Sequence, residues 1–210
     1  MSVRILILST VVMLIGIVPA YADHPKGNID AYMKAHEPYF QVIDLPSAPP
    51  FELIDAKGNK VRLSDFKNKV VVLNFTSTHC QNGCERQAAV IADIQQKVNI
   101  TPLKADVQFI TISADLTNDA QDAMKNYAQT HGFGATNWLF LTASKDANVA
   151  TTRTLVEAYN IRSELAENDQ ETEGVVTHVI DKGGRFAAKF HGLKFGPINL
   201  ILYISGIIDN

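Results

Sequence analysis

The sequence of 210 residues contains only two cysteines, Cys80 and Cys84, so there is no third cysteine with which either could mispair. No basic stripe interrupts the mildly acidic composition, which has a formal charge of −3, and this excludes a typical nucleic-acid surface. Repeats and low-complexity tracts are also absent. A hydrophobic content of 46% at this length indicates one globular domain.

A long hydrophobic run is missing as well. The most apolar stretch covers residues 5–18, fewer than the roughly 20 that a transmembrane helix needs. Arg4 precedes this stretch, and Ala20-Tyr21-Ala22 forms a small-x-small cleavage site before Asp23. Residues 1–22 are therefore expected to be a signal peptide, with a retained N-terminal membrane anchor as the alternative. Export to the periplasm would place the cysteines where a disulfide persists.

The part of the chain after the leader divides into an arm and a domain. Residues 23–50 are polar and interrupted by five prolines, which predicts an N-terminal arm laid over the domain formed by residues 51–210. The domain opens with two alternating segments, 51–54 and 60–63, around Gly58 and Asn59. This pattern is typical of a β-hairpin.

The rest of the domain alternates between strand and helix patterns. Strands are expected over 69–75, 106–113 and 137–142, and helices over 84–98, 118–131 and 147–159. A hairpin over 175–190 and an apolar helix over 197–208, expected to dock on the domain, complete the chain. Right-handed crossovers make the middle strands parallel and cover both faces with helices. This order predicts an α/β, thioredoxin-like sandwich with a central mixed sheet and an N-terminal β-hairpin.

The two cysteines follow the first strand of this sheet. Side chains four residues apart in a regular helix are too distant for a disulfide, so Cys80 is expected in the loop and Cys84 in the first helical turn. The helix N-terminus favours a thiolate. Three uses remain open at this point: thiol–disulfide exchange, capture of a soft ion such as Cu(I), or a structural bridge.

Several segments resemble the Sco/SenC family. The resemblance covers about residues 45–195 and rests on residues 51–66, 78–84, 112–115, 137–142 and 179–186, with Cys-x-x-x-Cys and the Asn-Trp strand as its most specific parts. It implies a thioredoxin-like fold, export or membrane anchoring, and copper binding through two cysteines and a histidine. It further implies a role in assembling the copper centre of cytochrome oxidase, and some members reduce that centre as thiol–disulfide reductases.

The sequence departs from the family pattern at three places. Gln81 and Glu85 stand where the family has proline after each cysteine, and Glu173 occupies the ungapped position of the family histidine. His178 lies five residues further on, inside the expected strand. The predicted metal ligands are therefore Cys80 and Cys84, with His178 as the third ligand and Glu173 in the family position. A buried strand histidine is the competing interpretation of His178.

Two functions follow from these residues. The first is an exported Sco-like dithiol protein, a copper chaperone whose client is a cytochrome oxidase subunit. The alternative is a periplasmic thiol–disulfide exchange protein, in which Cys80 attacks and Cys84 resolves, without stable metal binding; whether the chain is an enzyme stays open between the two. A peroxidase is disfavoured because Leu73 and Ser77 occupy the places of its characteristic proline and threonine. Nucleic acid is not an expected partner, and proximity to the membrane follows if the leader is retained.

Overall fold

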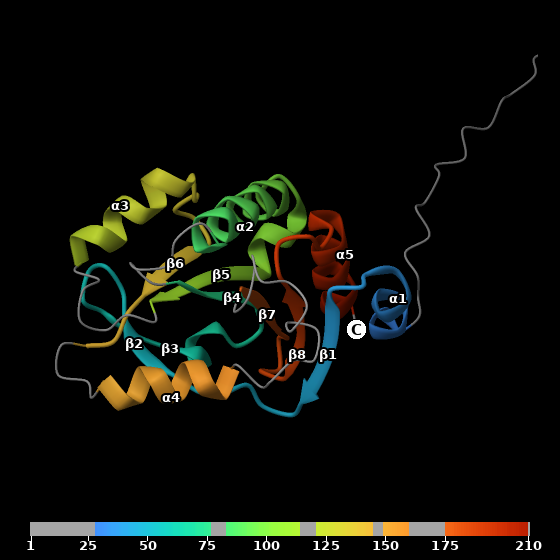
Figure 1. Cartoon of the computed structure of the whole chain (residues 1–210), viewed down its shortest axis with the longest axis horizontal. Helices are drawn as coiled ribbons and strands as arrows, with labels where there is room; N and C mark the ends of the chain where they lie inside the picture. Colours follow the sequence, from blue (N-terminus) through green and yellow to red (C-terminus); the bar gives the residue numbers. More distant parts are fainter. Residues whose placement is uncertain (1–27, 77–82, 114–120, 145–148, 160–174, 210) are drawn as a thin grey trace, which may run out of the picture.

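The computed structural model describes residues 28–76, 83–113, 121–144, 149–159 and 175–209. Its centre is a six-stranded sheet with the strand order β1-β8-β7-β4-β5-β6 (Figure 1). The strands are β1 (Phe40–Leu45), β4 (Val70–Thr76), β5 (Val107–Ser113), β6 (Trp138–Leu141), β7 (Val176–Ile180) and β8 (Phe186–His191).

The sheet is mixed, as the sequence predicts. β4, β5 and β6 run parallel, while β7 is antiparallel to β4 and forms a hairpin with β8. Every residue of β5 is buried, in keeping with its mostly β-branched and aromatic sequence. Because β7 opposes β4, the start of β7 lies at the edge of the sheet where β4 ends.

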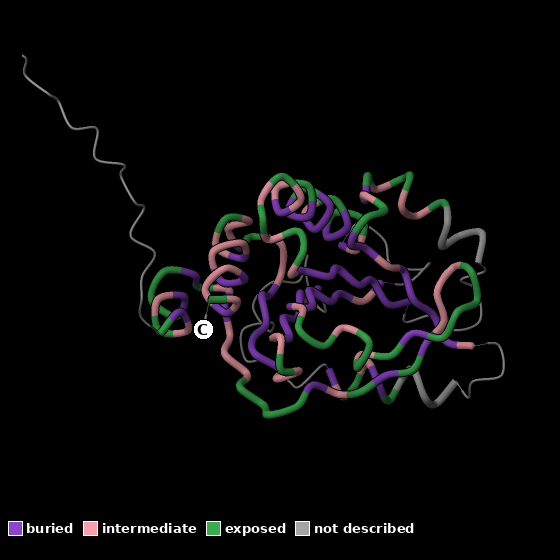
Figure 2. Tube along the Cα trace, turned by 180° about the vertical axis from the view of Figure 1, so that it is seen from behind, coloured by how far each residue is buried: buried purple, intermediate pink, exposed green. Residues whose placement is uncertain are grey.

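Two hydrophobic cores lie on the two faces of this sheet. One core contains residues of α1 (Ile29–His36), α2 (Gly83–Asn99) and α5 (Pro197–Ile208), with the segment after α3 (Gln121–His131) beside them. The other contains residues of the hairpin β2 (Glu52–Ile54) and β3 (Lys60–Arg62) and of α4 (Val149–Tyr159). Short 3-10 turns, Leu63–Phe66 and Pro102–Ala105, precede β4 and β5. Figure 2 shows the buried trace concentrated in the sheet between these layers. The predicted α/β sandwich and its N-terminal hairpin are confirmed.

The apolar stripe predicted for α2 faces the sheet. Ala88, Ile91, Ile94 and Val98 are all fully buried, as the 3.6-residue period of a helix requires. This stripe fixes the rotation of α2 about its axis, and it therefore also fixes the direction of the residues in its first turn.

Two elements lie in the segment that the sequence predicts to be an arm. α1 packs against α5, and β1 is an edge strand of the main sheet, with Phe40 paired to Phe190 of β8. The partner strand is far away in the sequence, so local periodicity gives no signal for this pairing. Pro38 and Pro46 flank β1 and do not interrupt it.

No helix in the described part of the chain is both long enough and apolar enough to cross a bilayer.

The contact between α1 and α5 depends on a glycine. A Cβ atom at Gly206 would lie 2.7 Å from Ile29 Cγ1, which is closer than carbon atoms approach without a shift. We expect Gly206→Ala to lower the free energy of unfolding by about 2 kcal/mol, because one helix must move away from the other. Chemical denaturation measures this change. Ser205→Ala, one residue earlier in the same helix, is the matched control, and an equal effect of both would contradict the close-approach explanation.

Candidate redox and metal site

Cys84 lies in the first turn of α2, at the edge of the sheet where β4 ends. β4 ends at Thr76 and α2 begins at Gly83. Cys84 is partly buried and disulfide-bonded. Cys80, the other cysteine of the sequence, lies outside the described residues. The prediction that the second cysteine stands in the first helical turn is confirmed.

A buried polar network spans three strands near the end of β4. The Trp138 indole Nε1 donates to Thr111 Oγ1 at 3.1 Å, and Thr111 Oγ1 donates to Asn74 Oδ1 at 3.0 Å. All three side chains are buried. The network links β6, β5 and β4 two residues before β4 ends, so it fixes the strand from which the cysteine segment departs.

Gln87 ties the first turn of α2 to the start of β7. Its Nε2 atom donates to the Val176 carbonyl at 3.0 Å and to Thr177 Oγ1 at 3.4 Å. This residue was not predicted from the sequence. The one sequence feature that marks Gln87 is a polar side chain next to the apolar stripe of α2, one turn after Cys84. Because its partner strand is remote in the sequence, the role is visible only in the folded structure.

This placement of Cys84 favours reversible thiol chemistry. The N-terminus of α2 presents the positive end of the helix dipole, which stabilises a thiolate. Reduction of the disulfide takes two electrons and two protons and yields two thiols. Binding of Cu(I) by the dithiolate would then release the thiol protons.

His178 lies in the middle of β7, opposite Leu73 of β4. Its Nδ1 atom is 3.2 Å from the Leu73 carbonyl oxygen, to which it can donate. Its Nε2 atom has no hydrogen-bond partner within the described part of the chain. The ring is 1% exposed and packs against the rings of Phe75, Tyr159 and Phe186. His178 thus occupies a largely aromatic part of the core.

The sheet separates His178 from α2. Thr177 points toward α2, since its hydroxyl accepts from Gln87, and successive side chains of a strand alternate between faces. His178 therefore faces α4, on the other side. Along the sheet, β4 continues three residues beyond Leu73 to Thr76, a distance of about 10 Å. A role for His178 as third copper ligand stays a prediction, and it would require the ring to leave its present packing.

Other candidate ligands lie elsewhere. Glu173 is outside the described residues, and Val175 is the first described residue after it. Among the residues that the structure describes, no three His, Cys, Asp or Glu side chains gather as a metal site. His191, at the end of β8, is buried and its Nε2 atom is bonded to Gln41 Oε1 at 2.8 Å.

Burial changes the protonation of three side chains on the α4 side of β7 and β8. It lowers the pKa of His178 to about 3, an effect to which the Lys189 ammonium adds. It lowers the pKa of His191 to about 4, again with a contribution from Lys189. The pKa of Lys189 itself falls to about 8 through burial. Both histidines are thus neutral in the folded protein across the physiological range.

Acidification should therefore destabilise the apo protein. The folded protein keeps His178 neutral down to about pH 3, whereas an unfolded chain protonates its histidines near pH 6.5. The contribution of neutral His178 to stability is full above pH 7 and is lost as the pH drops below 6.5, by about 2 kcal/mol at pH 5. Denaturation at pH 7.5 and pH 5 measures this loss.

The variant His178→Phe should lose this part of the pH dependence while keeping the aromatic packing. The exposed His36 on α1 offers a matched control, and His36→Gln should retain the wild-type slope. If the stability of His178→Phe falls between pH 7.5 and pH 5 as much as that of the wild type, the assignment of this pH dependence to His178 is contradicted.

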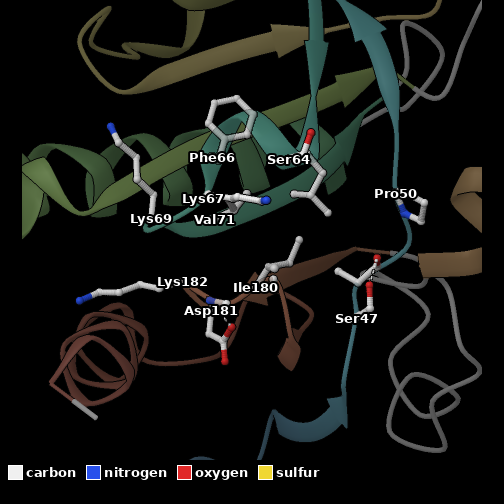
Figure 3. Close-up of a pocket in the computed structure, with 14 residues that line it drawn as sticks. Ser47, Pro50, Ser64, Phe66, Lys67, Lys69, Val71, Ile180, Asp181 and Lys182 are labelled. Carbon is white, nitrogen blue, oxygen red and sulfur yellow. Dashed lines mark hydrogen bonds between the residues drawn. The ribbon is translucent and has the colours of Figure 1, made fainter.

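A pocket of about 230 Å³ lies at the other end of β4 (Figure 3). Val71 and Ile180 line its floor, and Lys67, Lys69 and Lys182 line its rim. Val71 is near the start of β4, so this pocket is at the opposite end of the strand from the cysteine segment. It does not belong to the candidate redox site.

The fold is that of a thioredoxin-like protein, and one of the two cysteines of the chain, Cys84, stands at the start of a helix. A model of the SCO1/SenC family matches residues 44–204, which is most of the chain. The chain therefore belongs to the SCO1/SenC family.

Solved structures of the family share the fold. The structure of BsSco, described as a member of the Sco family of cytochrome c oxidase assembly proteins with a disulfide switch, aligns with a TM-score of 0.66. It is 18% identical, and the alignment covers 80% of this chain and 96% of that one. ScoI of Bradyrhizobium japonicum, solved with copper bound, aligns with a TM-score of 0.58 at 22% identity, over 77% of this chain and 99% of that one.

Curated relatives match over shorter stretches. The thiol-disulfide oxidoreductase ResA of Bacillus anthracis is 33% identical over 85 residues, which are 40% of this chain and 44% of ResA. The mitochondrial SCO2 homolog of Bos taurus is 25% identical over 130 residues, covering 62% of this chain and 46% of that protein. The chain thus matches less than half the length of each of these relatives.

Proposed function

We propose that this chain is an exported dithiol protein that carries copper to a cytochrome oxidase subunit. The observation that carries the proposal is the position of Cys84 at the N-terminus of α2, in a chain whose only other cysteine is Cys80. Two thiolates are a soft ligand pair suited to Cu(I). Membership in the SCO1/SenC family and the copper-bound ScoI structure support this chemistry.

Export is part of the same proposal. Residues 1–22 have the charge, the apolar run and the small-x-small site of a signal peptide. A location outside the cytoplasm is also supported by a SCO1/SenC family lipoprotein from Bacillus anthracis, whose structure aligns with a TM-score of 0.64 at 20% identity over 80% of this chain and 97% of that one. A periplasmic location would be compatible with the disulfide at Cys84. Copper loading would then follow reduction of the disulfide.

The alternative function is thiol–disulfide exchange without stable metal binding. It is supported by the similarity to ResA and by the disulfide at Cys84. In this mechanism the Cys80 thiolate attacks a partner disulfide, which forms a mixed disulfide between Cys80 and one partner sulfur and releases the other partner sulfur as a thiolate. Cys84 then attacks Cys80, the second thiolate of the partner leaves, and the partner is reduced while the chain is oxidised.

Competitive Cu(I) titration of the reduced, exported protein separates these functions. A copper carrier should bind one Cu(I) tightly against a chelator, whereas a pure exchanger should not. The variants His178→Ala and Glu173→Ala test which residue, if either, is the third copper ligand. From the buried place of His178 we expect its alanine variant to unfold at a lower temperature but to bind Cu(I) within about threefold of wild type.

The Cu(I) affinities of the wild type and of the two variants distinguish the possible ligand sets. A loss of Cu(I) affinity of more than about a hundredfold in folded His178→Ala would establish His178 as third ligand, because outer contacts alone account for smaller losses. The same loss in Glu173→Ala would assign the position to the carboxylate. Absence of tight binding by wild type would exclude the copper carrier, and a measured dithiol potential then tests the exchanger.

A further inference from the structure

The C-terminal helix α5 carries no charged residue in its twelve positions. Its inner face is buried, with Leu200, Tyr203, Ile204 and Ile207 packed in the core of the α2 side. The predicted docking of this helix on the domain is therefore confirmed. Its outer face remains to be explained, because the solvent side of a surface helix is normally charged or polar.

The outer face of α5 is apolar along its length. Ile198 is 57% exposed and Leu202 is partly exposed. Ile201 and Ile208 flank them; they are partly exposed and also pack against the core of the α2 side. Positions 198, 201, 202, 205 and 208 follow each other at helical spacing, so these side chains share one side of the helix. We call this set, with Ser205, the outer face of α5. At twelve residues the helix is about 18 Å long, enough to lie on a bilayer but not to cross it.

Lysines stand at both ends of this face. Lys194 is exposed and lies just before the helix. At the other end, Lys182 Nζ donates to the Ile208 carbonyl at 2.9 Å. Figure 3 shows Lys182 extending toward α5. Asp209 is the exposed acidic residue at this end. An apolar strip with lysines at its ends is typical of a helix that rests on an anionic lipid surface.

The start of the described chain lies beside α5. α1 begins at Ile29, and Ile29 contacts Gly206 of α5. In the sequence, only nine residues separate Asn28 from Val18, the last residue of the apolar stretch. Nine residues span at most about 30 Å. An N-terminal anchor would therefore hold the α1–α5 side of the domain close to the membrane.

We propose that the outer face of α5 binds the surface of an anionic bilayer. The apolar side chains enter the boundary between headgroups and acyl chains, and the lysines contact lipid phosphates. The contact places the domain in a fixed orientation on the membrane, and it is independent of the copper or redox chemistry.

Depth-dependent fluorescence quenching in the full-length chain tests this contact. Ile198→Cys, in a Cys80→Ser/Cys84→Ser background, carries a fluorophore, and vesicles of phosphatidylglycerol and phosphatidylcholine contain brominated acyl chains. The matched control is Ile100→Cys in the same background, since Ile100 is 88% exposed and lies outside α5. We expect the label at 198 to lose at least about half its emission, and the label at 100 to change little.

Two further measurements test whether the quenching depends on the outer face of α5 and on anionic lipid. Leu202→Glu in the chain labelled at 198 should restore most of the emission, and vesicles of phosphatidylcholine alone should quench less. Equal quenching at 198 and 100, or none at 198, would overturn the proposal. Equal quenching by neutral vesicles would overturn the preference for anionic lipid. Self-association through α5 without vesicles, seen by sedimentation and abolished by Leu202→Glu, would assign the face to a second copy of the chain.

Discussion

Cys84→Ser is expected to abolish both the disulfide and tight Cu(I) binding. Serine has nearly the same size but replaces a soft sulfur by a hard oxygen, and a single remaining thiolate cannot chelate the ion. Because loss of outer contacts alone costs up to about a hundredfold in metal affinity, loss of a direct ligand should cost at least that much. Competition with a Cu(I) chelator measures the affinity, and the thiol count under non-reducing conditions measures the disulfide.

The substitution Cys84→Ser should change Cu(I) binding and disulfide formation but not the stability of the reduced protein. Cys84 is only partly buried, so the unfolding temperature of reduced Cys84→Ser should stay close to that of the reduced wild type. Ala89→Ser, an exposed position in the same helix, is the matched control and should bind Cu(I) normally. Wild-type Cu(I) affinity in Cys84→Ser would contradict the proposed dithiolate site, whichever residue supplies the third ligand.

Glu37→Ala is expected to lower the free energy of unfolding by about 3 kcal/mol. Glu37 is only 3% exposed, and its carboxylate accepts three hydrogen bonds. Its Oε2 atom accepts from the Gly196 backbone and from Asn199 Nδ2, both at 2.8 Å, and its Oε1 atom accepts from the Tyr39 backbone at 3.2 Å. Alanine would leave these donors without their acceptor in a buried place.

The position of Glu37 adds to this effect. Gly196 is the N-cap of α5 and has no side chain of its own, so the remote carboxylate does the capping at the positive end of the helix. Chemical denaturation measures the loss. Glu52→Ala is the matched control: Glu52 is exposed, pairs with Lys60 and Arg62 on the surface, and should have little effect on stability. Similar losses in both variants would contradict the capping role.

The same helix connects stability to the proposed membrane contact. Glu37 fixes the start of α5, and Gly206 allows it to approach α1. Both act on the inner side of the helix. Substitutions on the outer face, such as Leu202→Glu, should therefore alter lipid binding with a smaller effect on folding than Glu37→Ala.

Much of the fold could be predicted from local patterns. The stripe of Ala88, Ile91, Ile94 and Val98 defines α2 and its buried side without knowledge of the partner strands. The run from Val70 to Phe75 defines a buried strand for the same reason. Local sequence also positions Cys84, since a helix that starts after a buried strand places its first turn at the end of that strand. These features depend on neighbours within a few residues.

β1 and His178 could not be predicted in this way. β1 forms because Phe40 pairs with Phe190 across the sheet, and no periodicity within residues 40–45 reports a partner so distant. The surroundings of His178 depend on which face of β7 receives α4, and hence on the packing of Phe75, Tyr159 and Phe186. The position of His178 relative to the cysteine helix could therefore be described only once its side of the sheet was known.

The sequence by itself determined the dithiol, its place between a strand and a helix, and the α/β class, because each follows from residue chemistry and short-range spacing. Only the tertiary structure decided that Gln87 ties the cysteine helix to β7, that Glu37 caps α5, and that His178 faces away from α2. It also separated the two sides of α5, one buried in the core and one apolar but exposed. These are relations between segments far apart in the chain, and only the folded backbone brings them together.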